Sequence, residues 1–397
     1  MSLQVSGPID ANAIRSEFGA TNGTSVRFGA YRVSQTVSAL TNMPLDAGIP
    51  QSGPIKFSDF YNKRLNVVVD YTPVGVGTAT RVTARTDYNA NNSKIVVIGN
   101  FRQRPVSPAA TKVWVHTNGD LGSDVKSTTK EYCSLRTGTW DSTTDLRLDI
   151  GPSGRVAGAG GDGGGGGIVL YNGDLSQGIG STGKNGTSGL GIQHTPIIIT
   201  NRGSIISGGG GGGGGGAASG YYARSEVLDV RYYHAIAGGS GGGGGIGYPG
   251  GTGGAGGTVD DRYNDRDSSA AIAGNVGLNG SFTSSGNGGK GSGQVTDRQV
   301  SAAGGGGGGG SVNGLGGANS DFPLGNLTNT AGYNATIGIG GSGGTGNGTG
   351  TDYGRESIGG LAGRSGWAIV IPNVGTGVTI INTGTIIGIT TYSTIPV

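Results

Sequence analysis

The sequence predicts a mainly β protein in three parts: a short helical N-terminal module, a β-sandwich-like middle domain, and a glycine-rich C-terminal domain with short strands. Three observations predict it. A tetrapeptide repeats near the N-terminus, runs of β-branched residues follow, and most of the 91 glycines among the 397 residues lie after residue 150. We therefore expect domains at 1–65, 66–150 and 151–397.

The N-terminal module is predicted from its repeat. Ser-Gly-Pro-Ile begins at Ser6 and again at Ser52, and a plausible short helix follows each copy. Ile14 and Phe60 occupy equivalent apolar positions in the two copies. Helices this short are marginal in isolation, so we expect them to pack against each other or against a partner.

The middle domain is predicted from five β-like segments, LNVVVDY, TRVTART, KIVVIGNF, KVWVHTN and DLRLDIG. Polar, Gly-containing or Pro-containing stretches separate them, which is typical of short strands. We expect a small antiparallel sandwich or an open sheet. Trp114 and Trp140 are either core residues or surface anchors, with the core favoured, and the expected core comprises Val113, Val115, Leu146, Leu148 and Ile150.

The C-terminal domain contains glycine blocks at 158–167, 208–216, 238–257, 304–310 and 340–350. Apolar steps flank the blocks, and the stretch 199–207 resembles 381–389. The spacing between such units varies, so we expect no regular solenoid.

A pure glycine run is either a flexible linker or an ordered rod. Linkers usually mix in serine or charge, whereas these runs are pure and adjoin apolar strands. An extended polyglycine II helix has three residues per turn and a rise of about 3.1 Å per residue. Its free N–H and C=O groups can bond to neighbouring helices where no side chain blocks the approach. The sequence therefore favours a bundle of polyglycine II helices over linkers.

A bundle of glycine rods has little side-chain surface, so function is expected on the segments that join the rods. The segments 217–235, 258–269, 318–335 and 351–357 are rich in Tyr, Arg, Ser and Asn, which are typical of adaptable binding surfaces. Alternatively, they are solvated loops whose Arg and Asp residues pair internally. The candidate binding residues are Tyr221, Tyr222, Arg224, Arg231, Tyr232, Tyr233, Arg262, Tyr263, Arg266, Phe322, Tyr333 and Tyr353.

Composition argues against several other classes. Charged residues make up only 13% and the net charge is +3, which disfavours a nucleic-acid partner. The single Cys133 permits no internal disulfide. We find neither a secretory signal nor an apolar run long enough to insert into a membrane. We expect a chain made and folded in a cytoplasm.

The motifs for catalysis or cofactor binding lack the structural context that they require. Gly-x-Gly-x-x-Gly patterns open no convincing βαβ unit, and the three histidines lie far apart. The acidic stretch 260–267 lacks the Gly and the terminal Glu of a calcium loop. We therefore expect no cofactor, no metal and no enzyme activity, and keep a surface-polysaccharide depolymerase as the enzyme alternative.

The N-terminal repeat resembles the short N-terminal module of many tailed-bacteriophage virion proteins. Ile55, Ser58, Asp59, Phe60 and Tyr61 match the pattern of that module. The resemblance implies attachment to the virion, and the residues that carry it are Ile14, Phe18, Ile55, Phe60 and Tyr61.

The C-terminal half, including GGLAGRSGWAIVIPNVGTGVTIINTGTIIGI, resembles the glycine-rich receptor-binding adhesins of tailed-phage fibres. The resemblance implies a tail-fibre or tail-tip adhesin whose loops between glycine runs bind a bacterial surface polysaccharide or outer-membrane protein. It further implies other fibre or baseplate proteins as partners, several copies per virion, and a location in the phage tail. The alternative is a purely structural component of the baseplate or fibre.

Overall fold

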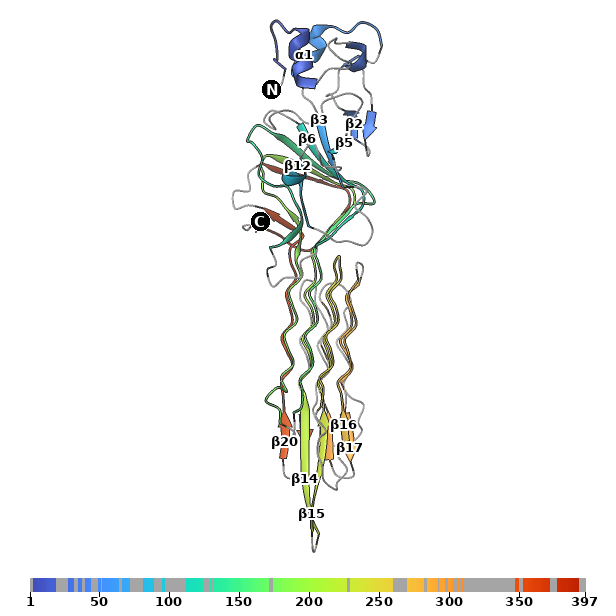
Figure 1. The fold of residues 1–397 in the computed structure, drawn as a ribbon, viewed down its shortest axis with the longest axis vertical. Helices are drawn as coiled ribbons and strands as arrows, with labels where there is room; N and C mark the ends of the chain where they lie inside the picture. The colour runs from blue at the N-terminus through green and yellow to red at the C-terminus, as the bar shows by residue number, and fades with distance from the viewer. Residues whose placement is uncertain are drawn as a thin grey trace.

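The computed structural model is an elongated molecule (Figure 1). A small N-terminal module lies at one end, three β-sheets follow, a stem of extended chains continues from them, and further strands form the far end, the tip. The C-terminus lies beside the three sheets, so the chain runs out to the tip and back. The structure describes residues 3–18, 28–31, 35–37, 40–43, 49–50, 52–63, 66–71, 81–88, 95–96, 112–123, 129, 131–170, 174–226, 229–259, 270–281, 284–291, 293–296, 299–302, 306, 309, 347–349, 353–371 and 377–392.

The N-terminal module packs around aromatic rings. Its elements are α1 (Ala11–Phe18), η1 (Phe28–Tyr31), β1 (Gln35–Val37), β2 (Leu40–Met43) and η2 (Phe57–Phe60). The Phe60 ring lies 5.6 Å from Tyr31 and 6.5 Å from Phe18, measured between centroids. Ile14 and Phe60 are fully buried. The prediction that the two repeat copies pack against each other is therefore confirmed. Within the described ranges, no helix has the length and apolarity needed to cross a membrane.

Three sheets of mostly parallel strands form the body of the molecule. We number them sheets 1 to 3. Sheet 1 contains β3 (Asn66–Asp70), β6 (Lys112–Thr117), β9 (Asp145–Ile150), β12 (Ile197–Asn201) and β22 (Val378–Asn382), with β5 (Ile95–Val96) antiparallel at one edge. Sheet 2 contains β4 (Val82–Thr83), β8 (Cys133–Arg136), β11 (Ser188–Gly191), β21 (Ile369–Ile371) and β24 (Thr390–Tyr392). Sheet 3 contains β7 (Asp120–Leu121), β10 (Arg155–Ala157), β13 (Ser204–Ile206) and β23 (Thr385–Ile387).

The body is a three-sided parallel β-helix. From β6 onward the chain visits sheets 1, 3 and 2 in turn, so each coil stacks its strands on those of the coil before. The expected antiparallel sandwich is therefore wrong. Alternation of apolar and polar residues is the same in parallel and antiparallel strands, and only the path of the chain between strands decides which partner each strand meets.

The interior of the coils holds the core that the sequence predicts. Val113, Val115, Leu146, Leu148 and Ile150 are at most 1% exposed, and Trp140 is buried as well. Trp114 is only partly buried and lies beneath the Arg147 guanidinium, 5.1 Å from its ring centroid. The core expectation is therefore wrong for Trp114, which lies on the outer face of β6 because its position alternates with the inward residues Val113 and Val115.

The β-helix continues past the expected domain boundary at residue 150. β9 pairs with β12, and β12 pairs with β22 in a register that joins Asn201 to Asn382. The similar stretches 199–207 and 381–389 are therefore stacked neighbours. The similar stretches are irregularly spaced along the sequence although their strands stack regularly. The reason is that two long insertions, 158–187 and 208–366, leave the coils between sheet 3 and sheet 2.

Those insertions form the stem, which we define as residues 158–167, 178–187, 208–216, 238–247, 250–257, 273–281, 284–291 and 357–366. Its chains are joined by backbone hydrogen bonds that advance in steps of three residues. The N–H groups of Gly161, Gly164 and Gly167 donate to the carbonyls of Gly209, Gly212 and Gly215 at 2.8–2.9 Å. The run 208–216 also donates to 181–187 and to 240–246, and accepts from 360–366. A free linker has no such partners, so the linker alternative is wrong for this run.

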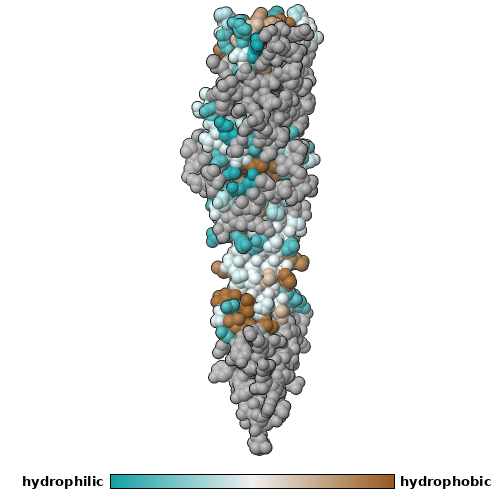
Figure 2. Space-filling model, viewed as in Figure 1, coloured by the Kyte–Doolittle hydropathy of each residue, from teal (hydrophilic) through white to brown (hydrophobic). Residues whose placement is uncertain are grey.

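Burial along the outer stem chains has the same three-residue repeat. In 357–366 the residues Ser357, Gly360, Gly363 and Gly366 are buried, whereas Ile358, Leu361 and Arg364 are exposed. Close packing explains the glycines: a Cβ on Gly164 would lie 1.9 Å from the Ser181 carbonyl oxygen. The exposed row carries Ile358 and Leu361 next to Ile179, and Figure 2 shows apolar side chains gathered on the lower stem.

The tip consists of two small sheets that contact each other. The first contains β14 (Ala218–Glu226), β15 (Asp229–Ala237), β16 (Ala270–Ile272) and β20 (Tyr353–Glu356). The second contains β17 (Gly293–Thr296), β18 (Gln299–Ala302) and β19 (Asn347–Thr349). A buried cluster of Val169, Ala217 and Ile236 lies where the stem meets the tip. β14 and β15 reach furthest from the N-terminal module (Figure 1).

Candidate binding surface at the tip

The segment 217–235, expected as a loop, is almost entirely a β-hairpin. β14 and β15 pair antiparallel over nine residues each. The expectation of an irregular loop is therefore wrong. The tyrosines and valines of this segment favour strand, and the two arms supply each other's main-chain partners. A hairpin places its residues in a defined register, which a loop does not.

The hairpin register brings predicted binding residues together in pairs. Tyr222 lies opposite Tyr233, Ala223 opposite Tyr232, and Arg224 opposite Arg231. Tyr221 is flanked on both sides, by His234 in β15 and by Tyr353 in β20. Tyr353 comes from a distant part of the sequence. The sheet therefore gathers seven of the predicted residues onto three adjacent strands.

The remaining predicted binding residues, Arg262, Tyr263, Arg266, Phe322 and Tyr333, lie outside the described residues. Their role stays a prediction. The structure adds two residues that sequence reasoning did not select. His234 lies opposite Tyr221, and Arg355 lies opposite Ser219. The position of His234 depends on the hairpin register, and that of Arg355 depends on the β14–β20 pairing, for which the sequence contains no local signal.

The residues predicted to attach the chain to the virion are mainly internal. Ile14, Phe18 and Phe60 are fully buried in the module, so their side chains are unavailable to a partner in this conformation. Ile55 and Tyr61 are partly exposed, and the Tyr61 hydroxyl donates to the carbonyl of Gly7. The phage-like motif therefore holds the module together, and attachment through the module stays a prediction.

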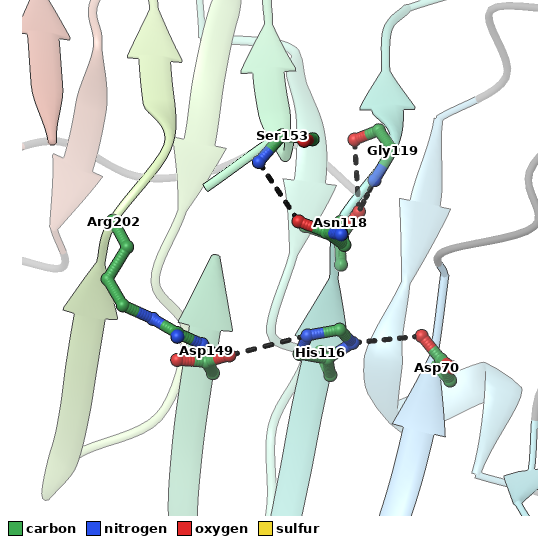
Figure 3. Close-up of polar contacts among 8 residues, drawn as sticks. Asp70, His116, Asn118, Gly119, Asp149, Ser153 and Arg202 are labelled. Carbon is green, nitrogen blue, oxygen red and sulfur yellow. Dashed lines mark hydrogen bonds and ion pairs between the residues drawn. The ribbon is translucent and has the colours of Figure 1, made fainter. Parts of the chain in front are cut away.

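A polar row crosses sheet 1, as Figure 3 shows, with His116 and Asp149 buried and Asp70 and Arg202 partly exposed. His116 Nδ1 lies 3.0 Å from Asp70 Oδ1, and His116 Nε2 lies 3.4 Å from Asp149 Oδ2. Arg202 donates to the same Asp149 oxygen at 2.7 Å. The four side chains come from β3, β6, β9 and the residue after β12.

This row suits a structural role. Both nitrogens of the His116 ring lie against carboxylates of neighbouring strands, so the ring is held between them. Next to the row, the Ser153 N–H donates to Asn118 Oδ1 at 3.0 Å and ties two coil corners together. The row joins neighbouring coils of the body, far from the tip.

The architecture defines a class of protein. A small N-terminal module lies at one end, a stem with few side chains spans the middle, and Tyr- and Arg-rich strands lie at the other end (Figure 1). This arrangement is that of an elongated fibre protein whose two ends differ in composition.

The comparison with known families identifies which one. The family model described as "Phage tail fibre adhesin Gp38" matches residues 78–297, more than half of the chain. The chain therefore belongs to this family, and it is a tail-fibre adhesin of a bacteriophage, as the resemblance implied. Membership favours the adhesin over the purely structural alternative and assigns the chain to the phage tail.

Other comparisons add less. The gp37–gp38 adhesin tip complex of the bacteriophage S16 long tail fiber is similar over 97% of this chain and 99% of that chain, with 18% identity and a TM-score of 0.30. A superposition this weak supports no residue-level argument. No curated protein sequence matches the chain.

Proposed function

We propose that the chain binds a host cell-surface receptor through its tip. The observation that carries the proposal is the register of β20, β14 and β15, which groups Tyr353, Tyr221, Tyr222, Tyr232 and Tyr233 at the end furthest from the N-terminal module. Tyrosines supply rigid contact area at low entropic cost. The predicted residues of 258–269 and 318–335 stay candidates for receptor contact.

We further propose that the stem chains are polyglycine II helices. The three-residue step of the hydrogen bonds and of the burial supports this conformation. At about 3.1 Å per residue, a ten-residue chain spans roughly 30 Å. Such a stem holds the tip away from the body while presenting few side chains of its own.

The N-terminal module is proposed to attach the adhesin to another phage tail protein. It occupies the end opposite the tip (Figure 1). The solved structure that is similar over 97% of this chain is a complex of gp37 with gp38. We assign 1–65 to attachment, 66–150 to a spacer and 151–397 to receptor display, with the spacer sharing its sheets with later strands. Several copies per virion would raise avidity for the host.

The proposed receptor is a bacterial surface polysaccharide or an outer-membrane protein, and the proposed activity is binding without catalysis. The test replaces Tyr222 and Tyr233, a cross-strand pair, with serine in phage carrying this adhesin. We expect adsorption to host cells to fall by at least tenfold while the virions still carry the chain. The matched control is Leu361→Ser on the exposed stem. Unchanged adsorption of the Tyr222/Tyr233 variant would contradict the assignment of the tip.

Further experiments separate receptor binding from attachment to the virion. Purified chain should block adsorption of the parent phage, and the purified tip variant should not. A chain truncated after residue 65 contains only the module, so virions that incorporate it without adsorbing would support the division of roles. Loss of incorporation on changing the tip would contradict that division.

A further inference from the structure

The outer chains of the stem differ from the inner ones in the residues that face the solvent. The inner run 208–216 is nine glycines, and all of them are buried. The outer chain 357–366 has small residues on its buried row and Ile358, Leu361 and Arg364 on its exposed row. Ile358 is 62% exposed and Leu361 69%. Side chains this exposed contribute little to the packing of the stem, so another role is needed to explain them.

The exposed row leaves main-chain donors directed away from the stem. The buried row donates inward, because the N–H groups of Gly360 and Gly363 bond to 208–216 at 2.7 and 2.8 Å. Successive residues of a chain with three residues per turn face three directions, so the exposed row points elsewhere. Among the described residues, the N–H groups of Ile358 and Leu361 donate to no acceptor.

A bundle held together by main-chain bonds can also grow sideways. The interior forms because glycine lets one backbone approach another, and a bare edge offers the same N–H and C=O groups to a further chain. An exposed sheet edge has this property, and proteins protect such edges against pairing with other copies. The stem of a second copy is a partner of matching chemistry, because its outer chains offer the same donors and acceptors.

At one bare glycine of the stem surface, a neighbouring side chain occupies the main-chain groups. Gly165 has free space beside it, since an added Cβ would meet nothing closer than Ser181 Oγ at 3.4 Å. The Gly165 N–H donates to Ser181 Oγ at 2.6 Å, and the Ser181 hydroxyl donates to the Gly165 carbonyl at 3.1 Å. Asn185 Oδ1 likewise accepts from the Arg364 N–H at 2.8 Å.

We propose that the exposed row of 357–366 keeps the stem closed to the stem of a second copy. The side chains of Ile358 and Leu361 hold a second backbone away from the outward N–H groups, and Ser181 and Asn185 bond directly to main-chain groups nearby. Exposed apolar residues commonly mark an interface. Here they act in the opposite sense, because the adhesive part of this stem is its backbone. This role does not depend on what the tip binds.

The experiment compares glycine with alanine at the two apolar positions of the full-length chain. Size exclusion with light scattering gives the mass across a concentration series, and the wild type should have single-chain mass. Ile358→Gly with Leu361→Gly should form larger species at a concentration at least tenfold below the highest at which the wild type keeps single-chain mass. Ile358→Ala with Leu361→Ala is the matched control, because it removes nearly the same apolar area and keeps the Cβ that blocks a second backbone. It should behave as the wild type does.

Ser181→Ala gives a second test that adds no glycine. It leaves the Gly165 N–H without its acceptor and should also promote association, whereas Ser181→Thr keeps the hydroxyl and should not. Cys133 is fully buried and reports on folding, because its thiol should stay unreactive in every associated species.

Hydrogen exchange locates the contact. The amides of residues 358 and 361 should exchange at least tenfold more slowly in the associated glycine variant than in the same variant at high dilution. Equal masses for the glycine and alanine variants, or for Ser181→Ala and Ser181→Thr, would overturn the proposal. So would a wild type that associates and loses this association in both double variants, since Ile358 and Leu361 would then form an interface. Association with rapid labelling of Cys133 would also overturn it, because unfolding would be the cause.

Discussion

The β-helix body fills its interior with side chains, whereas the glycine stem packs backbone directly against backbone. In the body, side chains such as Leu148 and Ile199 fill the space enclosed by three sheets. In the stem, chains approach until backbone atoms touch, and a Cβ on Gly211 would lie 1.9 Å from the Asp162 carbonyl oxygen. The body loses stability when a side chain is removed. The stem loses it when a side chain is added.

The strongest test of this contrast adds a side chain to the stem. Gly164→Val places a Cβ 1.9 Å from the Ser181 oxygen, and that oxygen belongs to a neighbouring backbone that has little room to shift. We expect a loss of on the order of 4 kcal/mol or local unfolding of the stem. Thermal unfolding followed by circular dichroism measures it. The neighbouring Gly165→Val is the matched control, because its Cβ would meet Ser181 Oγ at 3.4 Å. Equal losses for the two variants would refute close backbone packing.

Thiol labelling of Cys133 tests whether the body stays folded when the stem is destabilised. Burial raises the pKa of its thiol to about 12, and the side chain is fully buried in β8. Its reaction with a thiol reagent at pH 8 should be slow in the folded chain, because reactivity follows the thiolate. We expect the thiol to stay protected in Gly164→Val. Rapid labelling of that variant would mean that stem and body unfold as one unit.

The converse substitution removes a side chain from the body. Leu148→Ala leaves a cavity in the coil interior, because Leu148 is only 1% exposed. The expected loss is about 3 kcal/mol, measured by chemical denaturation. An exposed counterpart, Leu361→Ala on the stem, should change stability by less than about 0.5 kcal/mol. If the two substitutions cost the same, the body core has been misassigned.

The polar row of the body predicts a smaller effect. His116→Gln removes the ring that lies 3.0 Å from Asp70, while Asp149 keeps Arg202 at 2.7 Å. Removing one member of a buried ion pair is destabilising, and the partial exposure of Asp70 reduces the expected cost to about 2 kcal/mol. Asp70→Asn in the same background should then cost less than in the wild type. Additive losses would show that the two residues are not coupled.

His194 gives the smallest expected effect and a pH dependence. Burial lowers the pKa of its imidazole below the ordinary value, and Nε2 lies 3.4 Å from the Thr144 carbonyl oxygen. The unfolded chain therefore binds a proton at higher pH than the folded chain does. The stability that comes from neutral His194 is present above about pH 6.5 and falls as the pH drops below it. His194→Gln should flatten that part of the profile, and an unchanged profile would remove His194 as its source.

How far the sequence predicts the structure differs between the two regions. The core residues Val113, Val115, Leu146, Leu148 and Ile150 follow from alternation alone, because burial on one side of a strand needs no knowledge of its neighbour. The antiparallel pairing expected for the same strands was wrong. The candidate site shows the same limit, since composition indicates Tyr221 and Tyr353 but not that they share a register.

By itself, the sequence determined the main aliphatic core residues of the body, that the glycine runs need neighbours, and that Tyr and Arg collect between them. These properties depend on composition and local period. Only the tertiary structure decided that the strands coil in parallel and that 217–235 is a hairpin. Pairing joins residues such as Asn201 and Asn382 across a long insertion, and the chain path that brings them together depends on every coil between the N-terminal module and the stem.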